Sequence, residues 1–502
     1  MTVTVQRQDL NGGTANPQVL KPEYYDPDLP CYHHPSLISL LPILNEVEDC
    51  YTGITTWFKG GRIIDGYKAS CYLPQAEKEP DTAYLNRLKR SRWVNFFRRT
   101  IDGFSGLLTD FELSSDNPKS TQDNLEDVDM QGASLRAFLS TADEIALRDG
   151  FCGILVEYPK RPEITSAADE LAYPLRPYFC LIERRDIVNW SVVNNRLESL
   201  VVRRCTTEPE GRYSTKEVEQ FWVMSPGYYQ VFEVREVDQE NRVVILVDEV
   251  ELRSPNGEVF SEIPIVFYPI NTINPFTSLP PLHDLALDNI AHYQEWSDYR
   301  EVRYKCNLPV PVREGMISEP PAPLTIGPNT VVDLPMGGKF YFAEPTGVAI
   351  ASTRQAIIDL EAEMLRRSLS FFGNNLNMTA TEVELRSAQT KSGLFQMAAD
   401  KESAVQSLFR LWTNWTGEEN IGGISVNRSI LKAPLSPQAV QVFANLVVGG
   451  LLDHQTFWEI LNEGGVLPES ATVQDLVKRS VPEGEDRDAG TRGHGDAETE
   501  RF

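Results

Sequence analysis

The sequence predicts an α+β fold in which helices, a β-rich block and a second set of helices follow one another along the chain. Hydrophobic residues make up 41% and charged residues 24% of the 502 residues, which is typical of a globular protein and not of a disordered one. Apolar residues recur at helical spacing before residue 150 and again after residue 281. Between these regions, short segments rich in Val, Ile, Tyr and Phe are separated by turn residues, which indicates strands.

The front of the chain is interpreted as an arm followed by helices. Residues 1–34 are rich in Pro, Gly, Asn and Asp, which favours an arm over a packed element. Residues 81–108 carry apolar side chains at helical spacing, which predicts one long amphipathic helix. Because this is the most basic stretch of an acidic chain, four of its arginines are candidates for a subunit interface: Arg87, Arg90, Arg98 and Arg99. A solvated helix face is the alternative interpretation.

A β-rich block is expected after a helix over 134–149, which Gly150 would end as a C-terminal cap. The hydrophobic period changes there to that of short strands, which predicts mostly antiparallel β-structure. The expected strands are Gly153–Tyr158, Tyr178–Ile182, Leu197–Arg203, Val218–Met224, Tyr228–Val234, Val243–Val247 and Pro264–Ile270.

Two further helices are expected on either side of a compact insert. The first, from Leu282 to about Cys306, would be roughly 35–40 Å long at 1.5 Å per residue. The insert is rich in Pro and Gly, with strand-like pieces at Thr330–Leu334 and Lys339–Ala343. It is too irregular for a helix and too apolar for a flexible linker. The second helix runs from about Ser352 to Ser370, where an apolar stripe ends.

A break then interrupts the helical pattern, because its residues disfavour helix and tolerate turns: Gly373, Asn374, Asn375 and Asn377. Thr379 and Glu382 have capping-box spacing, so their side chains can cap a third helix that continues toward Trp415. Two small helices, over 436–448 and 454–463, are expected next. The tail from about residue 481 loses its apolar residues, which predicts disorder.

The charge of the chain argues against several classes of protein. Lys and Arg number 47 against 72 Asp and Glu, a net charge of −25. A protein that coats nucleic acid needs a basic surface to displace counterions, and an acidic membrane face attracts basic patches. No apolar run approaches the roughly 20 residues that span a bilayer, and the first 30 residues lack the apolar stretch of a signal peptide. We therefore expect a cytoplasmic product without membrane contact.

The sequence predicts no catalytic residue, no metal site and no cofactor. Its seven cysteines are scattered and never spaced C-x-x-C, which predicts reduced thiols in place of a zinc site or a disulfide framework. The usual nucleophile, zinc-protease and nucleotide-binding motifs are absent. Gly337–Lys339 lacks the other residues of a phosphate loop, and His33 and His34 have no partner at ligand spacing.

Several motifs follow one another in the order in which one family of viral proteins has them. They are Asp149–Val156 at a helix-to-strand transition, Asp186–Trp190 in a β-segment, Glu262–Val266 before a long helix, Thr379–Val383 at the start of another, and Gly449–Pro468 near the end. On these motifs the chain resembles the portal (head–tail connector) proteins of tailed bacteriophages. Tyr72–Asn95 also resembles an uncharacterised portal-like family. The resemblance covers residues 35–470.

The resemblance implies a mainly helical wing with a β-rich segment, two stem helices bracketing a small α/β clip, a long helix after a tunnel loop, and a small helical crown. The boundaries that it implies are an N-terminal arm (1–34), the wing (35–281), the first stem helix (282–307), the clip (308–350), the second stem helix (351–372), the tunnel loop (373–378), the long helix and wing return (379–434), the crown (435–480) and a disordered tail (481–502). Gly373, Asn374, Asn375 and Asn377 would then face a DNA channel, with Thr379 and Glu382 capping the next helix.

The function that the resemblance implies is not enzymatic. A portal is a homo-oligomeric ring of about twelve copies at one capsid vertex of the virion, assembled in the host cytoplasm. It is the conduit for packaging and ejecting double-stranded DNA, and it contacts the terminase, a tail adaptor and the major capsid protein. Two alternatives stay open: another oligomeric head–tail joining protein without a DNA channel, or a hydrolase with an unrecognised site.

Overall fold

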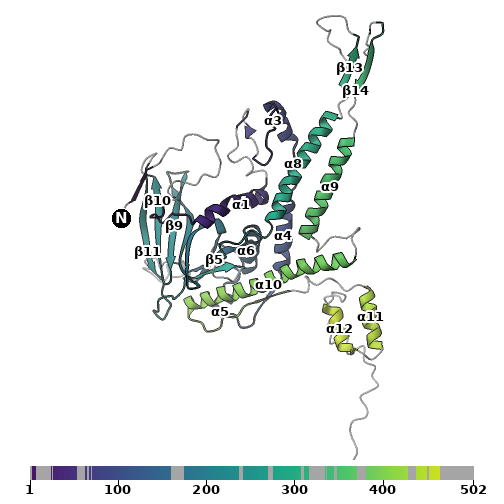
Figure 1. Ribbon diagram of the computed structural model, residues 1–502. Coiled ribbons are helices and arrows are strands. Elements are labelled where there is room, and N and C mark those ends of the chain that lie inside the picture. Colours follow the sequence, from purple (N-terminus) through teal and green to yellow (C-terminus); the bar gives the residue numbers. More distant parts are fainter. Residues whose placement is uncertain are drawn as a thin grey trace, which may run out of the picture. The chain divides into compact units, whose positions relative to one another are not determined.

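The computed structural model describes residues 3–6, 24, 26–53, 63–64, 67–68, 71–159, 175–236, 241–269, 275–306, 310–315, 334, 336–343, 348–369, 380–427, 437–448 and 452–463. The chain divides into two units, Met1–Val426 and Asn427–Phe502. The first unit combines helices with several antiparallel sheets, and its fold is therefore mixed α+β, as the sequence predicts (Figure 1).

Six antiparallel strands form the main sheet of the first unit. In sheet order they are β1 (Val3–Gln6), β11 (Asn241–Glu251), β10 (Tyr228–Glu236), β9 (Thr215–Ser225), β8 (Arg196–Pro209) and β7 (Ile187–Val193). β8 and β9 pair over the greatest length, from Leu200 opposite Met224 to Pro209 opposite Thr215. The antiparallel block that the sequence predicts is confirmed. β1 is a strand that the expected set did not include, whereas β7 overlaps the β-segment expected at Asp186–Trp190.

A second antiparallel sheet lies between the main sheet and the helices. Its strands, in sheet order, are β12 (Ile265–Tyr268), β5 (Cys152–Glu157) and β6 (Tyr178–Ile182). Ile154 and Val156 of β5 belong to a core shared with helices, whereas Leu155 belongs to a core shared with the main sheet. This division follows from the strand's period of two, which directs successive side chains to opposite faces. β5 is therefore buried on both sides.

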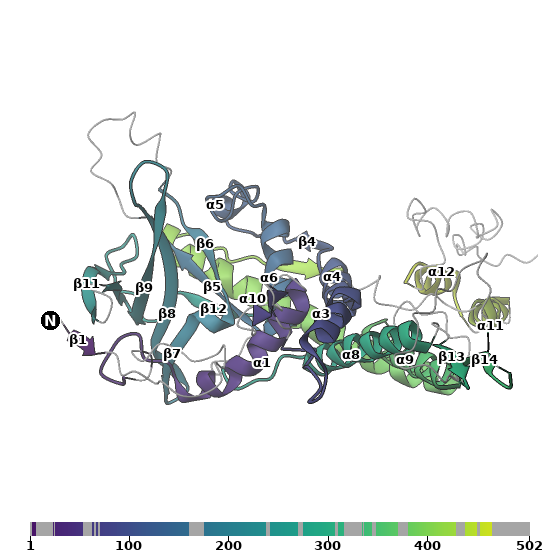
Figure 2. The same cartoon turned by 90° about the horizontal axis from the view of Figure 1, so that it is seen from above.

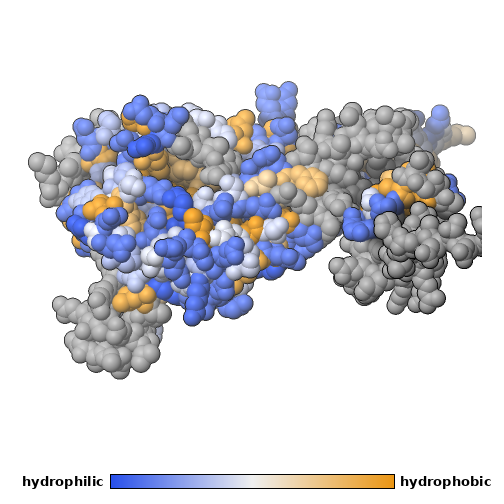
Figure 3. Space-filling model, turned by 90° about the horizontal axis from the view of Figure 1, so that it is seen from below, coloured by the Kyte–Doolittle hydropathy of each residue, from blue (hydrophilic) through white to orange (hydrophobic). Residues whose placement is uncertain are grey.

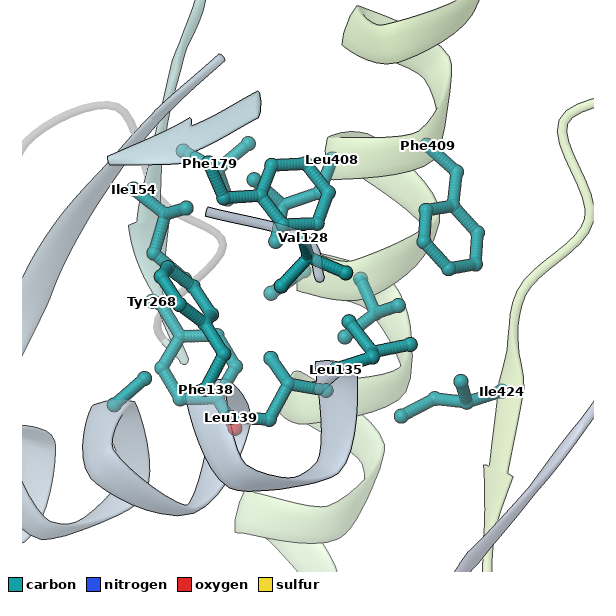
Figure 4. Close-up of a cluster of buried hydrophobic side chains, with 14 of the residues drawn as sticks. Val128, Leu135, Phe138, Leu139, Ile154, Phe179, Tyr268, Leu408, Phe409 and Ile424 are labelled. Atoms are coloured by element: carbon teal, nitrogen blue, oxygen red, sulfur yellow. The ribbon is translucent and has the colours of Figure 1, made fainter. Parts of the chain in front are cut away.

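The largest core joins this second sheet to α6 (Leu135–Asp149) and α10 (Ala380–Thr416). Figure 4 shows Phe138 and Leu139 of α6, Phe179 of β6 and Leu408 of α10 converging on it. Leu139 and Leu408 have no exposed surface. Burial of side chains of this size stabilises the fold by about 1.5–3 kcal/mol each. The second half of α10 is therefore held firmly in the body of the first unit.

The turn that follows α6 is built around a buried arginine. Arg184 donates hydrogen bonds to the carbonyl oxygens of Asp149 (2.6 Å), Phe276 (3.0 Å) and Ser278 (2.5 Å). Burial lowers the pKa of its guanidinium to about 10, so it keeps its charge at neutral pH. Gly150 has a φ of +98°, and a β-carbon there would lie 3.1 Å from Arg184 Nη1. Only glycine meets both conditions at this position.

Helices α1 (Pro35–Thr52), α3 (Asp81–Arg90) and α4 (Phe96–Leu108) pack beside α6 and α8 (His283–Cys306). The single helix predicted over 81–108 is wrong, because residues 91–95 separate α3 from α4. Ser91 has extended backbone angles, and the Asn95 side chain accepts a hydrogen bond from the amide of Arg98 to start α4. Asn95 is thus an N-cap in the middle of a continuous apolar pattern.

Part of the predicted N-terminal arm is packed. Tyr24, Leu29 and Cys31 are buried in a core with the main sheet, and the Tyr24 hydroxyl donates to the Glu219 carboxylate. The arm prediction is therefore wrong for residues 24 and 26–34. The prediction followed the high content of Pro, Asn and Asp and gave no weight to these three apolar residues. Their burial against the sheet holds this segment in place although the residues around them favour turns. Most of the remaining arm lies outside the described residues.

A long two-helix hairpin extends from the body of the first unit (Figures 1 and 2). α8 runs outward, β13 (Val310–Glu314) and β14 (Lys339–Ala343) pair antiparallel at the far end, and α9 (Val348–Leu369) runs back. The β14 prediction is confirmed to the residue. The other strand-like piece, 330–334, lies outside the described residues apart from Leu334.

Short elements complete the two units. β4 (Phe111–Leu113) pairs with β15 (Ile424–Val426), β2 (Ile63–Ile64) pairs with β3 (Tyr67–Lys68), and α5 (Lys119–Gln122) lies between β4 and α6 in sequence. The second unit contains α11 (Pro437–Val448) and α12 (His454–Glu463), two helices that the sequence predicts almost to the residue. The tail predicted to be disordered, 481–502, lies outside the described residues.

Candidate functional site

The described residues contain no constellation typical of an enzyme. Among them, no group of three His, Cys, Asp or Glu side chains is placed to hold a metal ion. None of the described helices is long and apolar enough to cross a membrane. Figure 3 shows one face of the molecule, on which hydrophilic side chains predominate and apolar ones are scattered. The candidate functional site is the two-helix hairpin together with the residues that hold it.

Polar and aromatic contacts fix α8 against α9. His292 of α8 is fully buried, and its Nε2 lies 3.0 Å from Glu361 Oε1 of α9. One turn further on, the guanidinium of Arg354 lies 5.7 Å from the ring centroid of Trp296 and 6.0 Å from that of Tyr299. His292 precedes Trp296 in α8, whereas its partner Glu361 follows Arg354 in α9. The two helices therefore run antiparallel. The pairing fixes the register of the hairpin.

Asn289 joins α8 to the start of α4. Its Oδ1 accepts hydrogen bonds from the amides of Phe96 (2.9 Å) and Phe97 (3.0 Å), and its Nδ2 donates to the carbonyl of Val94 (2.9 Å). Asn289 is fully buried. The first amides of a helix have no partner within it, so this side chain satisfies two of them from outside. Asn289 was not among the residues that the sequence singled out, because its partners lie 193 residues away.

Two of the four candidate interface arginines pair within the chain. Arg87 is buried and donates from Nε and Nη2 to the two oxygens of Glu79 (2.8 and 2.7 Å), with a further bond to the carbonyl of Pro74 (2.9 Å). The hydrogen bonds that Arg87 donates to Glu79 raise the pKa of its guanidinium. Arg90 forms an ion pair with Glu301 of α8. These two arginines therefore fix α3 to its surroundings.

The other two candidates are exposed on α4. Arg98 lies 3.7 Å from Asp102, one turn along the helix, and its guanidinium lies 5.1 Å from the ring centroid of Tyr51. Both side chains of the Arg98–Asp102 pair are about half exposed, so the pair contributes little to stability. Arg99 is exposed. A contact of Arg98 and Arg99 with another subunit stays a prediction.

The predicted tunnel loop lies outside the described residues. This applies to Gly373, Asn374, Asn375 and Asn377, and also to the cap residue Thr379. Glu382 lies in the first turn of α10, at residues whose side chains are not described. The described part of α10 begins at Ala380, and the cap formed by Thr379 and Glu382 stays a prediction.

A buried ion pair anchors the far half of α10. Lys401 Nζ lies 2.6 Å from Asp143 Oδ2 of α6 and donates to the carbonyl of Leu108 at 2.9 Å. The hydroxyl of Tyr268, from β12, donates to the other Asp143 oxygen. Burial raises the pKa of Asp143 and lowers that of Lys401, and their mutual attraction opposes both shifts. The Lys401–Asp143–Tyr268 triad joins α6 and β12 to α10, and the bond to Leu108 adds the end of α4. The sequence did not single out this triad.

A cleft of about 490 Å³ opens between β9–β11 and the end of α10. Two stacked aromatic pairs line it, Trp222 with Tyr229 and Tyr158 with Trp415. Glu157 at the cleft is paired with Arg204 at 3.0 Å. Asp248 and Glu251 also line the cleft, so its lining combines apolar rings with carboxylates.

Comparison with known proteins gives one family match and several structural similarities. Residues 281–416 match the model of a family described as "Domain of unknown function (DUF4055)", a stretch that runs from α8 through α10. No curated protein matches the chain.

Three of the similar solved structures come from gene transfer agent (GTA) particles. The neck of the empty particle, computed with C6 symmetry, is 9% identical over 73% of this chain and 89% of that one, with a TM-score of 0.37. The neck of the native particle, computed with C12 symmetry, is 10% identical over 73% and 89%, with a TM-score of 0.36. A chain of the native virion is 9% identical over 78% and 96%, with a TM-score of 0.37.

Proposed function

We propose that the chain is a portal protein, a non-enzymatic ring at one vertex of a viral or virus-like capsid. The observation that carries the proposal is the two-helix hairpin. α8 and α9 extend from the body with the β13–β14 hairpin at their far end, and the chain then returns through α10 into the main core. This order of stem, clip, stem and wing return is the one that the sequence motifs imply.

In this proposal the two helices form the stem and β13–β14 belongs to the clip. A two-stranded hairpin is marginally stable by itself in water. β14 also carries Tyr341 and Phe342 exposed at 44% and 46%. A clip that is covered by neighbouring copies, the terminase or a tail adaptor accounts for both features.

The charge of the chain suits a passage for DNA. Each copy contributes a net charge of −25, so a ring is strongly acidic. An acidic wall repels phosphate, which prevents the duplex from binding tightly as it slides. The loop at Gly373–Asn377 would project into the channel in this proposal. Its amide side chains would touch the DNA backbone without the strong electrostatic attraction of Lys or Arg.

The proposed partners are other copies of the chain, the terminase, a tail adaptor, the major capsid protein and the passing DNA. Arg98 and Arg99 stay candidates for the contact between copies, because opposite charges on facing surfaces favour a defined register. If they serve this role, replacing both with Glu weakens assembly at low salt, measured by light scattering. Unchanged assembly of that variant would remove them from the interface.

Negative-stain images of the purified protein separate the proposal from its alternatives. The portal proposal predicts rings with a central hole wide enough for a DNA duplex. Rings without a passage would support a head–tail joining protein without a channel. Particles that stay monomers or dimers over a range of salt concentrations would contradict both and favour an enzyme with an unrecognised site.

A further inference from the structure

One edge of the main sheet is only partly covered by a neighbouring strand. β1 pairs with Asn241–Val244 of β11, and this pairing ends where Val3 lies opposite Val244. Among the residues that the structure describes, none pairs with Ile245–Glu251 on this side of β11. We call Ile245–Glu251 the open edge, and Figures 1 and 2 show β11 near the outer end of the main sheet.

The open edge is apolar where it begins. Val244, the last residue that β1 covers, is buried, whereas Ile245, Leu246 and Val247 are 40%, 43% and 49% exposed. Native proteins avoid exposed apolar edge strands, because the backbone groups and apolar side chains of such an edge pair with other chains. The open edge therefore has the properties of a surface that a further strand covers.

The backbone of the open edge directs hydrogen-bonding groups outward. The amide of Leu252 donates to the carbonyl of Gly227, next to β10. Successive residues of a strand direct their N–H and C=O groups to alternate sides, so Glu249 and Glu251 direct theirs away from β10. The Glu249 amide donates instead to the Asp248 carboxylate, at 2.9 Å. A local side chain thus takes the position of a ladder carbonyl.

The open edge also forms one rim of the aromatic cleft. Four of its residues line this cleft of about 490 Å³: Val247, Asp248, Val250 and Glu251. The stacked rings of Tyr158 and Trp415, with centroids 5.4 Å apart, line it as well. Stacking holds these rings in place, so the cleft is formed before anything binds in it. A strand added at the open edge would direct every second side chain toward the cleft.

The two faces of the open edge favour different side chains in an added strand. Val250 lies opposite Tyr229 of β10, on the face that lines the cleft. Glu249 lies opposite Gln230 and accepts a hydrogen bond from its Nε2 at 2.8 Å, so its carboxylate lies on the other face. Side chains on one face of the added strand would therefore meet apolar groups, and those on the other would meet a carboxylate.

Acidic side chains outnumber basic ones along the open edge. Between residues 248 and 253 the chain has three carboxylates and one guanidinium, that of Arg253. Arg253 pairs with Glu251 at 2.9 Å, and both side chains are about half exposed. A basic partner complements this edge. Because the whole chain carries a net charge of −25, charge complementarity favours a segment of a different protein over a second copy.

We infer that the open edge and the cleft together bind an extended segment of another protein, in which apolar residues alternate with Lys or Arg. The segment adds to the main sheet as a strand beside β11. Its backbone hydrogen bonds supply affinity, and the fit of apolar side chains in the cleft and of cations to the carboxylates supplies selectivity. This inference goes beyond the proposed function, since it holds whether or not copies of the chain close into a ring.

A capped synthetic peptide of alternating Val and Lys, long enough to span residues 245–251, is the probe. Fluorescence anisotropy measures its binding to the full chain. Two analogues of equal charge carry backbone N-methyl groups, one on every Val and the other on every Lys. Only one of these sets of amides faces β11 in an added strand, so one analogue should bind at least about tenfold more weakly and the other like the unmodified peptide.

Two outcomes of the peptide experiment would overturn the inference. The first is equal binding of the two methylated analogues, because attraction to an acidic chain in general does not distinguish them. The second is an unmodified peptide that does not bind at millimolar concentration.

A pair of protein variants locates the site. Val247→Lys places a cation on the open edge, where it opposes both strand addition and a basic peptide, and should weaken binding at least about tenfold. Val193→Lys is the matched control, because Val193 is 46% exposed on β7, at the opposite end of the same sheet. We expect both variants to retain the circular dichroism spectrum of wild type. Equal affinities of the two variants for the peptide would overturn the inference.

Discussion

Lys401 illustrates at the scale of one residue how the fold is held together. Its ammonium group and the Asp143 carboxylate are both buried and pair at 2.6 Å, with Tyr268 completing the triad. Such a pair stabilises the fold little more than well-packed apolar residues would. Removing only one partner is strongly destabilising, because the other charge is left buried and unpaired. The pair fixes the position of α10, because only one register of this helix brings Lys401 to Asp143.

We predict that Lys401→Met lowers the free energy of unfolding by about 3–5 kcal/mol, because Asp143 is left buried without its cation. The triple variant Lys401→Met/Asp143→Leu/Tyr268→Phe removes all three polar groups and should recover much of the loss. Urea unfolding followed by circular dichroism measures both. A triple variant as unstable as the single one would show that the pair itself, and not the unpaired charge, governs stability.

Sequence reasoning could not find this triad, although each member is visible in the sequence. Lys401 follows the helical pattern of a long helix that also carries exposed charges, and Asp143 lies 258 residues away. Local periodicity says which side chains share a face, but it does not say which distant element covers that face. Arg87 illustrates the opposite case. Its charge on an amphipathic segment predicts an exposed interface residue, but the side chain is buried against Glu79.

At the scale of elements, the helices and strands with strong local signals could be predicted from the sequence. α12 and β14 have the predicted bounds, and α8 differs by one residue, because caps, Pro and Gly residues and apolar spacing mark them. The break between α3 and α4 was not predictable. It depends on Asn289, a residue of α8 that supplies the acceptor for the first amides of α4. Both helices pack on α8, so apolar residues continue through the break.

Asn289 provides a test at this scale. We predict that Asn289→Ala costs about 1–3 kcal/mol of stability, since two buried amides lose their acceptor. Asn95→Ser, which retains an oxygen at the N-cap of the same helix, should cost less. Thermal unfolding of the two variants compares them. Equal stability of Asn289→Ala and wild type would mean that water replaces the side chain and that Asn289 does not hold α4.

The clip assignment also belongs to the element scale. Deleting residues 315–328 should leave the wing folded, because the core residues that the structure describes all lie outside this range. We expect this variant to lose binding to terminase or to a tail adaptor in pull-down experiments. Its circular dichroism spectrum should match that of wild type apart from the missing residues. Retained binding to both partners would contradict the clip assignment.

The whole-molecule prediction concerns the path of DNA. Replacing Asn374, Asn375 and Asn377 with Lys adds three positive charges per copy to the proposed tunnel loop. Such a ring would hold phosphate electrostatically, so packaging should slow, and slow further at low salt where screening is weak. Replacing the same residues with Gln is the neutral control. A normal packaging rate for the Lys variant at low salt would place the loop away from the DNA.

We propose that copies of this chain form a closed ring around a passage, with the two-helix hairpin at its wall. A cryo-electron microscopy map of the purified oligomer tests it most directly. We predict a ring in which α8 and α9 surround an open centre, with β13–β14 at one end and the main sheet at the periphery. A closed assembly with a filled centre, or one whose passage is lined by the main sheet, would contradict it.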